Sequence, residues 1–308
     1  MHREVTKIIR DIKSLKIQGA RNVAKASLEA LIIVAKNSKA KTNSDFIKEF
    51  ADAADVLSVS RPTEPMMRNL LRESVEFAEK SAKKKTPAMV KKAVISHEKM
   101  LIRKMDGDAK KLATYGAKLI PNNAIVLTHC HSSTVTRILI AAKKMRKKFK
   151  VVSFETRPRY QGRKTAKELA DSGIDVTLAV DGAMQMFMKK ADIVLVGADS
   201  ITSRGDLINK IGTSTLAHIA KMNDVSLYCA AELSKYSPKT MFGTREEIEE
   251  RNPKEVWERA PRKVKIRNPA FEATAAKYIN GFVTEVGVIP SQSFFAVATE
   301  KLGIKLYE

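Results

Sequence analysis

The sequence predicts an α/β protein in which a helical N-terminal domain, residues 1–117, precedes a domain built on a parallel sheet, residues 118–308. Apolar residues recur at helical spacing throughout the first part. From about Ile120, short apolar runs alternate with amphipathic segments, a pattern typical of βαβ units and of a parallel sheet covered by helices on both faces. The length of 308 residues suffices for one large or two ordinary domains.

The N-terminal helices are predicted from the apolar spacing and from the residues that interrupt it. Apolar positions predict one helix near the N-terminus and a second over 23–35. Ser44 is the expected N-cap of a third helix, which begins near Asp45. Pro62 and Pro65 then break the pattern, because proline disfavours helix at the residue before it. Two further helices are expected, over about 66–83 and 87–117.

The second half contains apolar runs of strand length. A run that stops abruptly at small or polar residues is typical of a buried parallel strand, and open α/β sheets bind ligands at the C-terminal ends of such strands. The predicted strands are 124–127, 151–154, 176–180, 193–196, 226–230 and 282–285. The segments expected as helices between them are 133–147, 164–172, 184–190 and 213–223.

The charge balance is strongly basic. The chain has 56 Lys and Arg against 34 Asp and Glu, which gives a formal net charge of +22. A field of this size attracts phosphates, nucleic acid or acidic membranes. The basic runs, among them 143–150 (KKMRKKFK), are scattered and lack interleaved aromatic residues, so we interpret them as a solvated surface. Binding of RNA or DNA is the alternative.

Several classes of feature are not expected. The sequence has no run of about 18 apolar residues, so no membrane span is expected. The charged N-terminus also lacks an apolar signal core. The two cysteines, Cys130 and Cys229, follow or lie within apolar runs, so free thiols and a cytoplasmic location are the default. A metal site at His129, Cys130 and His131 is not expected, because neighbours in an extended segment point to opposite faces.

Cys130 and Asp199 are the candidate catalytic residues. Cys130 lies in THCHSS after the run 124–127, and Asp199 lies in GADS after the run 193–196, so both are expected at the same edge of the sheet. A thiolate can accept a proton and a carboxylic acid can donate one, which suits an isomerase. The alternatives are a core position for Cys130 and a turn-capping role for Asp199.

Other segments are candidate anion contacts. Glycines, an amide and a lysine precede a predicted helix in 205–213 (GDLINKIGT), which makes this segment a plausible anion cradle. It is neither a Walker motif nor a GxGxxG fingerprint, so nucleotide binding has no support from it. Arg157 follows a predicted strand and suits phosphate recognition, with a structural ion pair as the alternative. Lys235 is expected near the same edge, and Cys229 is expected in the core.

A set of short motifs occurs in one order along the chain: GAR, RPT, THCHSS, ETRPRYQG, GADSI, GD-x-x-NKIGT, AAE-x-x-K and NPAFE. Together they resemble the family of initiation factor 2B regulatory subunits and sugar-phosphate isomerases over nearly the whole chain. They look most like the archaeal branch that acts on ribose 1,5-bisphosphate. The resemblance implies a helical N-terminal domain, a Rossmann-like C-terminal domain, and catalysis without a metal or nicotinamide cofactor.

The resemblance also implies roles for individual residues. Cys130 would remove the proton from C2 of the sugar, and Asp199 would protonate the ring oxygen. A phosphoenolate would form and would then be reprotonated at C1. The implied phosphate and sugar contacts are Gly19, Ala20, Arg21, Asn22, Arg61, His131, Ser132, Ser133, Arg157, Asn209, Lys210 and Lys235.

Two other functions stay open within this resemblance. The GD-x-x-NKIGT form is also typical of methylthioribose 1-phosphate isomerases, and a regulatory subunit would bind a sugar phosphate or nucleotide and contact initiation factor 2. The presence of Cys130 beside Asp199 favours catalysis, because the regulatory subunits typically lack this cysteine. The resemblance further suggests a homo-oligomer, a hexamer assembled from dimers.

Overall fold

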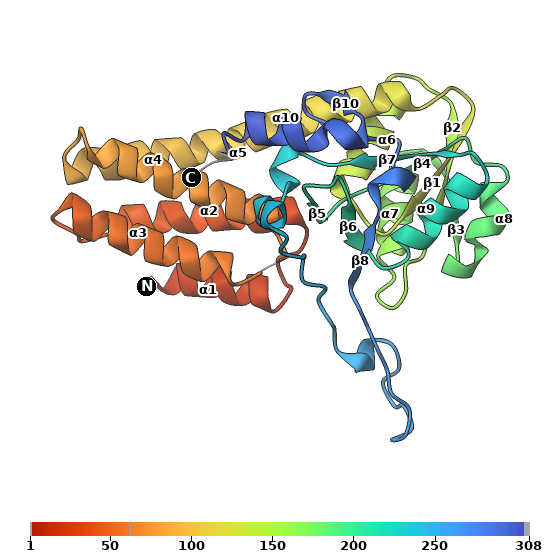
Figure 1. Ribbon diagram of the computed structural model, residues 1–308, viewed down its shortest axis with the longest axis horizontal. Coiled ribbons are helices and arrows are strands. Elements are labelled where there is room, and N and C mark those ends of the chain that lie inside the picture. The colour runs from red at the N-terminus through yellow and green to blue at the C-terminus, as the bar shows by residue number, and fades with distance from the viewer. Residues whose placement is uncertain (1, 62, 305–308) are drawn as a thin grey trace. The chain divides into compact units, whose positions relative to one another are not determined.

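The computed structural model describes residues 2–61 and 63–304 (Figure 1). It divides into two compact units, with the boundary between Gly107 and Asp108. This boundary falls inside one long helix, α5 (Pro87–Leu119). The predicted domain boundary between residues 117 and 118 lies near the C-terminal end of the same helix and stays a prediction.

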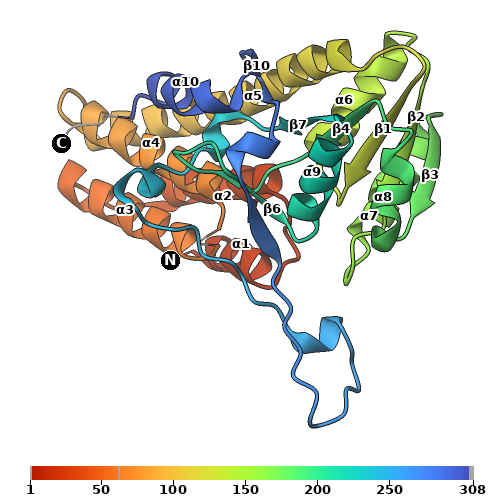
Figure 2. The ribbon, with the colours of Figure 1, turned by 45° about the vertical axis from the view of Figure 1, so that its right-hand side comes forward.

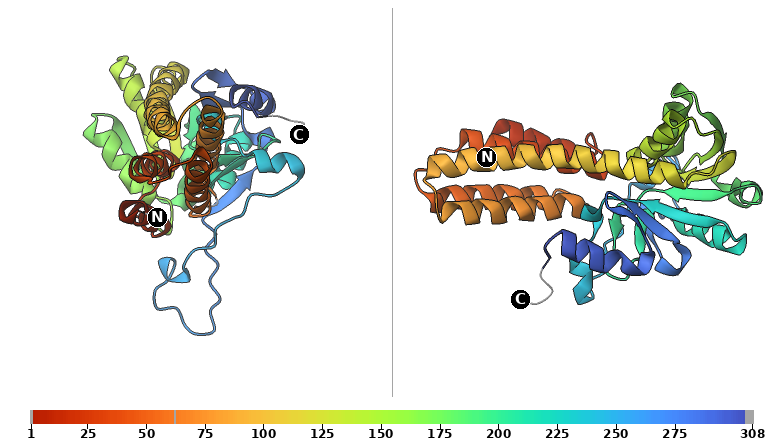
Figure 3. Two further views of the ribbon diagram at one scale, coloured as in Figure 1. Left: turned by 90° about the vertical axis from the view of Figure 1, so that its left-hand side faces the viewer. Right: turned by 90° about the horizontal axis from the view of Figure 1, so that it is seen from above.

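In the described residues of the first unit, all regular secondary structure is helical, as the apolar spacing predicts. Its helices lie side by side (Figure 3). The fully buried side chains between them include Leu28, Phe46, Phe50 and Met67. The helices are α1 (Arg3–Lys13), α2 (Ala20–Asn37), α3 (Asn43–Ser58), α4 (Pro65–Ala82) and the first part of α5. The two predicted helices after the proline-containing break correspond to α4 and α5.

The cap of α3 differs from the prediction. Thr42, and not Ser44, is the N-cap, because the Thr42 Oγ1 accepts the Asp45 backbone N–H at 3.1 Å and the helix begins at Asn43. The Thr42 hydroxyl also donates to the Asp45 carboxylate at 2.7 Å. Threonine and serine are both good caps, and this reciprocal pair places the start of the helix earlier than Ser44 would.

The second unit is built on a seven-stranded sheet of order β10-β9-β7-β4-β1-β2-β3. Neighbouring strands are parallel from β9 to β3, and β10 pairs with β9 in the antiparallel direction. Every predicted strand is present, whereas β10 has no counterpart in the sequence analysis. The strands are β1 (Ala124–His129), β2 (Phe149–Phe154), β3 (Asp175–Ala179), β4 (Ile193–Val196), β7 (Ser226–Ala230), β9 (Gly281–Thr284) and β10 (Gly287–Ile289).

Both faces of this sheet are buried, which explains why its strands are apolar runs rather than alternating patterns. Along β4, Ile193 and Leu195 join one buried cluster, and Val194 and Val196 join another. Since successive side chains of a strand point to opposite faces, the two clusters are the two covered faces. The helices of this unit are α6 (Ser133–Lys144), α7 (Gln161–Asp171), α8 (Met184–Met188), α9 (Thr213–Met222) and α10 (Phe294–Lys301).

A second, three-stranded antiparallel sheet was not predicted. It consists of β5 (Ser200–Ile201), β6 (Leu207–Lys210) and β8 (Phe271–Thr274), with β6 in the middle. The chain reaches β8 through a long excursion over 243–270, which Figure 2 shows as an extended blue loop. Glu250 and Pro269 pair across its base. The candidate anion cradle therefore contains a strand, and short strands of this kind are hard to detect from periodicity.

The strand order creates a topological switch point between β1 and β4. The chain leaves β1 toward β2 and β3 on one side and returns to β4 on the other. Loops that follow two such strands run apart, and open α/β sheets bind ligands in the space between them. Cys130 follows β1 and Asp199 follows β4, so the fold places both predicted catalytic residues at this point.

Gly162, in the first turn of α7, allows that helix to approach β2 closely. A Cβ atom at this position would lie 1.7 Å from the Phe154 carbonyl oxygen, which is backbone and cannot move aside cheaply. We therefore expect Gly162→Ala to destabilise the protein by about 3 kcal/mol or more in urea unfolding. The control is Gly182→Ala, where a Cβ would meet nothing within 4 Å. Equal urea midpoints for the two variants would contradict the close approach.

Candidate functional site

Cys130 is held by backbone hydrogen bonds at the end of β1. Its N–H donates to the Thr156 Oγ1 at 2.8 Å, and its carbonyl accepts the Thr165 hydroxyl at 2.9 Å. Thr156 follows β2 and Thr165 lies on α7. The thiol is thus carried on a segment fixed by two neighbouring elements, although Cys130 itself stays partly accessible.

Two residues at this edge adopt a left-handed backbone that non-glycine residues rarely take. Cys130 has a φ of 67° and Thr156 has a φ of 65°. This conformation is least favourable for a β-branched residue such as threonine, and it costs roughly 1–3 kcal/mol. The two residues follow adjacent parallel strands and are bonded to each other. Such strain gathers at functional sites, where the surrounding fold maintains it.

The electrostatics of Cys130 connect it to other predicted residues. Burial raises the pKa of the Cys130 thiol to about 11, the Lys210 ammonium opposes this shift, and the carboxylates of Asp199 and Asp181 add to it. Lys210 lies on β6 and is 7% exposed. The Lys210 ammonium and the Asp199 carboxylate are therefore close enough to influence the protonation of the thiol.

The Asp199 segment is fixed on both sides. The Asp199 N–H donates to the Ile208 carbonyl of β6 at 3.0 Å. The carbonyl of the preceding Ala198 accepts the Lys235 Nζ at 2.6 Å. Lys235 follows β7 and is only 5% exposed, so the buried ammonium tethers the loop after β4. This places Lys235 at the same edge as Asp199, as the sequence predicts.

Ser132 connects the two strand ends. Its Oγ accepts the Val135 N–H at 3.3 Å and caps α6, which begins at Ser133. A Cβ on Gly197 would lie 2.6 Å from this Oγ, so only glycine allows the loop after β4 to pass Ser132. The N-terminus of α6, which favours negative charge, thus lies at the switch point close to Cys130 in sequence.

The two histidines that flank Cys130 have separate surroundings. His129 is buried, and this burial lowers its pKa to about 4, so it is neutral at pH 7. Its Nε2 lies 3.8 Å from the Asp181 Oδ1. The His131 Nδ1 lies 3.1 Å from the Thr165 Oγ1, which directs the ring toward α7, and burial also lowers its pKa. A direct contact of His131 with substrate stays a prediction.

The predicted anion cradle holds an anion that belongs to the chain itself. The backbone N–H groups of Gly212 and Ser214, at the start of α9, donate to one carboxylate oxygen of Glu272 at 2.7 and 2.8 Å. Glu272 lies on β8, the strand that the sequence analysis missed. The start of α9 is therefore already neutralised by Glu272, and within the predicted cradle the Gly212 N–H is not available to a ligand anion.

The polar residues of β6 are buried beside this helix terminus. Asn209 is 5% exposed, and its Nδ2 donates to the Thr213 Oγ1 at 3.0 Å. The Thr213 hydroxyl donates to the Lys210 carbonyl at 2.7 Å. The Lys210 Nζ lies 4.7 Å from the centre of the Phe271 ring. Packing and hydrogen bonds thus restrict both predicted contacts, Asn209 and Lys210.

Arg157 is exposed, and both its backbone N–H and its guanidinium donate hydrogen bonds. The N–H groups of Thr156 and Arg157 donate to the two Asp181 carboxylate oxygens at 2.8 and 2.7 Å. The guanidinium donates to the Tyr160 hydroxyl and, at 3.1 Å, to the Val256 carbonyl of the excursion 243–270. The structure thus fixes the loop after β2, and a phosphate contact of Arg157 stays a prediction.

The remaining predicted contacts belong to the first unit. Gly19 is the N-cap of α2, and Ala20, Arg21 and Asn22 form its first turn. The Arg21 guanidinium donates to the Met105 carbonyl at 2.8 Å and to the Asp106 carboxylate at 2.9 Å. Arg61 lies between α3 and α4. Their contacts with substrate stay predictions.

Four residues that hold the backbone of the site in place were not predicted from the sequence, namely Thr156, Thr165, Asp181 and Glu272. Asp181 follows the predicted strand 176–180, so the rule that identified Cys130 and Asp199 would also have identified it. Thr156 stands inside the quoted motif ETRPRYQG, and Glu272 inside NPAFE. No local pattern distinguishes Thr165, whose role depends on the packing of α7 beside Cys130.

Glu285 follows β9 and carries an unusual carboxyl group at this edge. Both of its carboxylate oxygens lie within 3.3 Å of the Leu233 N–H. Burial raises its pKa to about 7, and the neighbouring carboxylates of Glu232 and Asp108 contribute to this shift. The folded protein therefore binds a proton on Glu285 more tightly than the unfolded chain, whose glutamate titrates near 4.5.

This shift predicts a pH-dependent stability. The contribution of Glu285 is fully present below pH 4.5 and is lost as the pH rises through about 7. We expect Glu285→Gln, which stays neutral and can still accept the Leu233 N–H, to gain stability over wild type by up to roughly 3 kcal/mol between pH 4.5 and pH 8. Urea unfolding at a series of pH values measures this difference. A difference that is independent of pH would contradict the raised pKa.

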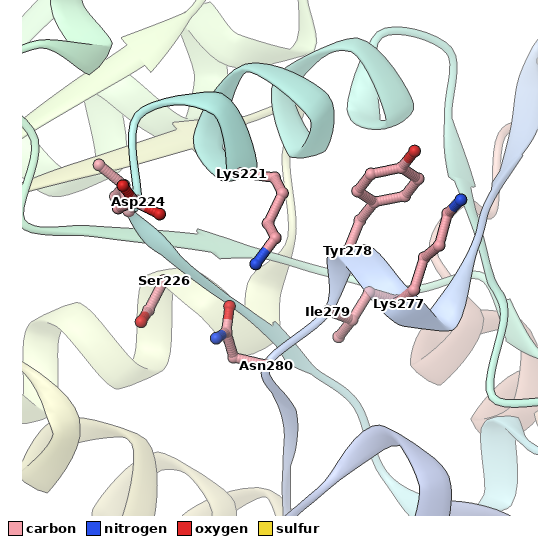
Figure 4. A pocket seen from close by; sticks show the side chains of 8 residues that line it. Lys221, Asp224, Ser226, Lys277, Tyr278, Ile279 and Asn280 are labelled. Carbon is pink, nitrogen blue, oxygen red and sulfur yellow. The ribbon is translucent and has the colours of Figure 1, made fainter.

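A polar pocket lies at the opposite edge of the sheet, at the N-terminal ends of β7 and β9 (Figure 4). Its volume is about 200 Å³, and its lining includes Lys221, Ser226, Lys277 and Tyr278. Lys221 lies in the last turn of α9, where a cation stabilises the helix dipole. A structural role thus explains one of the two pocket lysines, and the pocket is separate from the edge that carries Cys130.

Within residues 2–61 and 63–304, no group of three or more His, Cys, Asp or Glu side chains is placed to hold a metal ion. None of the helices described there is long and apolar enough to cross a membrane. Cys229 is fully buried, and its thiol donates to the Gly197 carbonyl at 3.4 Å, which confirms its expected position in the core.

Comparison with known proteins places this arrangement in a family. The model of the initiation factor 2 subunit family matches residues 16–291. The chain is 40% identical to a ribose 1,5-bisphosphate isomerase from Pyrococcus furiosus, over 98% of this chain and 95% of that protein. It is 34% identical to a methylthioribose-1-phosphate isomerase from Geobacter sulfurreducens, over 90% of this chain and 85% of that protein.

Among solved structures, the fold is similar to that of translation initiation factor eIF-2B from Pyrococcus horikoshii OT3. The TM-score is 0.81 and the identity is 31%, over 94% of this chain and 98% of that one. Fold, motif order and full-length similarity all agree. The chain belongs to the initiation factor 2 subunit family.

Proposed function

We propose that this protein is a sugar-phosphate isomerase that converts ribose 1,5-bisphosphate to ribulose 1,5-bisphosphate. The observation that carries the proposal is the pairing of Cys130 with Asp199 at the switch point between β1 and β4, where the Asp199 charge influences the thiol. The 40% identity to the Pyrococcus furiosus protein, a ribose 1,5-bisphosphate isomerase, supports this substrate over the alternatives.

The reaction needs a base and an acid at different atoms of the sugar. A phosphate ester at C1 prevents the free ring opening of a hemiacetal, so the bond between C1 and the ring oxygen must be broken with catalysis. In the proposed step the Cys130 thiolate takes the proton from C2, and the C2–H electrons form a double bond to C1. The bond from C1 to the ring oxygen breaks, and the Asp199 carboxyl gives its proton to that oxygen.

The resulting phosphoenolate then becomes the product. The C2 hydroxyl gives its proton to the Asp199 carboxylate and becomes the ketone, as C1 takes a proton from the Cys130 thiol, which yields ribulose 1,5-bisphosphate. Overall, the hydrogen on C2 has been replaced by one on C1, the C2 hydroxyl proton has been exchanged for one on the former ring oxygen, both side chains are restored, and no redox equivalent is consumed. The intermediate loses less to side reactions when water is excluded, and the buried residues around Cys130 support this exclusion.

Cationic and polar groups of the site suit a substrate with two phosphates. Lys210 and Lys235 are buried ammonium groups, and the N-terminus of α6 at Ser132 and Ser133 favours an anion. We propose that these groups bind the substrate together with Asn209, His131 and Arg157. As the family resemblance implies, we also propose substrate contacts for residues of the first unit, namely Gly19, Ala20, Arg21, Asn22 and Arg61.

The test is turnover of purified protein on ribose 1,5-bisphosphate, followed as formation of ribulose 1,5-bisphosphate. Methylthioribose 1-phosphate serves as the competing substrate, because a methylthioribose-1-phosphate isomerase is also a relative. A higher kcat/KM on the bisphosphate supports the proposal. A preference for methylthioribose 1-phosphate would reassign the substrate and retain the chemistry.

A second candidate function is that of a regulatory subunit. The similar structure of translation initiation factor eIF-2B from Pyrococcus horikoshii OT3 favours it. Under this alternative the chain would bind a sugar phosphate and contact initiation factor 2, and copurification with that factor in the absence of turnover would support it. In either case we propose a cytoplasmic homo-oligomer, a hexamer, which native mass spectrometry tests directly.

A further inference from the structure

We propose that the chain has a second anion site, a basic pocket formed by the segment 143–150, which binds the phosphodiester backbone of nucleic acid without reading its sequence. The pocket has a volume of about 520 Å³. Five cationic residues and one acid dominate its lining, namely Lys143, Arg146, Lys147, Lys148, Lys150 and Asp175. The sequence alone suggested a solvated surface for this run, whereas the fold gathers it around one concavity.

The basic pocket lies at the edge of the sheet opposite Cys130. It is formed where α6 ends and β2 begins, whereas Cys130 follows the C-terminal end of β1. Because β1 and β2 are parallel, these are opposite ends of the same strands. The pocket is therefore independent of the proposed catalysis, and its occupancy does not depend on the identity of the sugar substrate.

The backbone of the segment 143–150 is held in place by hydrogen bonds. The five cationic side chains that line the pocket, which we call its rim, are therefore carried on a fixed backbone rather than on a flexible tail. The Lys147 ammonium donates to the Lys118 carbonyl at 3.0 Å and also to the Ile120 carbonyl. The Lys148 N–H donates to the Asn122 Oδ1 at 2.8 Å. These bonds tie the segment to the end of α5. Lys147 is thus occupied structurally, and the other four cations of the rim are exposed.

The charge of the rim is nearly uniform. Asp175 is the acidic member of the lining, and its carboxylate lies 3.4 Å from the Lys150 Nζ. Both of these side chains are largely exposed, so water and salt screen their attraction. Lys143, Arg146 and Lys148 add positive charge that this carboxylate does not offset, and a phosphate ligand would find a positive potential there.

The form of the pocket favours a polymer of phosphates over a single phosphate. Exposed ammonium groups contribute little to binding one screened anion, whereas several phosphates in a row add their contacts and release counterions. The aromatic residue of the lining, Phe149, is 9% exposed, so it offers little surface for a base to stack on. Contacts limited to phosphates predict binding that depends on salt and is indifferent to sequence.

The test uses the full chain and a fluorescein-labelled, mixed-sequence single-stranded RNA of 20 nucleotides in fluorescence anisotropy. The variant combines Lys143→Gln, Arg146→Gln, Lys148→Gln and Lys150→Gln, and retains Lys147. The matched control combines Lys83→Gln, Lys84→Gln, Lys85→Gln and Lys92→Gln, which removes the same charge from exposed lysines of the first unit. Both variants therefore have the same net charge.

We expect the pocket variant to raise the Kd for this RNA about tenfold or more in 100 mM NaCl, and the control variant to change it less than twofold. We also expect the slope of log K against log salt to fall by roughly 2–3 in the pocket variant alone. Unchanged thermal unfolding and sugar-phosphate turnover would show that the pocket variant is folded.

Three outcomes would overturn the proposal. Equal weakening by the two variants would assign binding to the overall charge rather than to the pocket. Unchanged binding in the pocket variant would exclude the site. Tight binding of inorganic polyphosphate, with no measurable RNA binding by wild type, would assign the pocket to a different polyanion.

Discussion

Cys130→Ala is expected to lower kcat on ribose 1,5-bisphosphate by about 10³-fold, because general base catalysis contributes this order of magnitude. Alanine removes the proposed base and keeps the backbone, whose hydrogen bonds to Thr156 and Thr165 need no side chain from residue 130. Substrate affinity should change little, since the proposed phosphate contacts remain. The measurement is kcat and KM of the variant, with its circular dichroism compared to wild type.

The control for this variant is Cys229→Ala. Cys229 is the other cysteine of the chain, lies fully buried on β7, and has no proposed part in the chemistry. Its loss should cost about 1 kcal/mol of stability, through the small cavity it leaves, and should retain turnover within a few-fold. Equal losses of kcat in the two variants would show that the effect of Cys130→Ala is structural.

The pH profile provides an independent check on the same residue. With a pKa of about 11, the Cys130 thiol is protonated at pH 7, so the reactive thiolate is a minor form. In wild type the rise in thiolate is opposed by the loss of protonated Asp199, so the check uses Asp199→Asn, in which residue 199 does not titrate. Its residual kcat/KM should rise with pH between pH 7 and pH 9, because the thiolate fraction rises. The double variant Cys130→Ala with Asp199→Asn should lack this rise, and a flat profile of Asp199→Asn would count against a thiolate base.

Asp199→Asn is expected to lower kcat by about 10²-fold or more, although it should make the thiol more acidic. The Asp199 carboxylate raises the pKa of Cys130, so its replacement by a neutral amide lowers that pKa and increases the thiolate fraction. If Asp199 acted only through this charge, the variant would be faster at neutral pH. If it donates the proton to the ring oxygen, the variant is slower because asparagine cannot donate one.

Two readouts separate these roles of Asp199. The rate of alkylation of Cys130 by iodoacetamide against pH reports the thiol pKa, which should fall in Asp199→Asn, with Cys130→Ala as the blank. The value of kcat reports the acid. A lower thiol pKa together with a lower kcat supports the proposed acid, whereas a lower thiol pKa with an increased kcat would reject it.

The strands of the large sheet could be predicted because a strand that is buried on both faces consists of consecutive apolar residues. The segments 193–196 and 226–230 coincide with β4 and β7. The strands of the small sheet could not be predicted in this way. β5 is two residues long, and β6 lies inside a motif whose glycines and polar residues suggest a loop.

The part of the candidate site that follows strands of the large sheet could also be predicted from local sequence. Cys130 and Asp199 follow recognisable strands, and an abrupt change from apolar to polar residues marks such positions. Glu272 could not be identified from the end of an apolar run. The residues just before α9 suggest a site for a ligand anion, whereas a carboxylate from a strand some 60 residues further along the chain accepts the N–H groups at the start of this helix. Pairings between distant segments leave no periodic signal.

The sequence by itself determined the class of fold, the strands that form the large sheet, and the thiol and carboxyl groups at its edge, because each depends on burial or chemistry within a few residues. Only the tertiary structure decided which strands are neighbours, that Thr156 and Thr165 hold Cys130, and that Glu272 occupies the start of α9. It also decided that the basic run 143–150 surrounds a pocket. The physical reason is that hydrogen bonds and charges act over a few ångströms in space, and the folded chain brings within that range groups that are far apart in sequence.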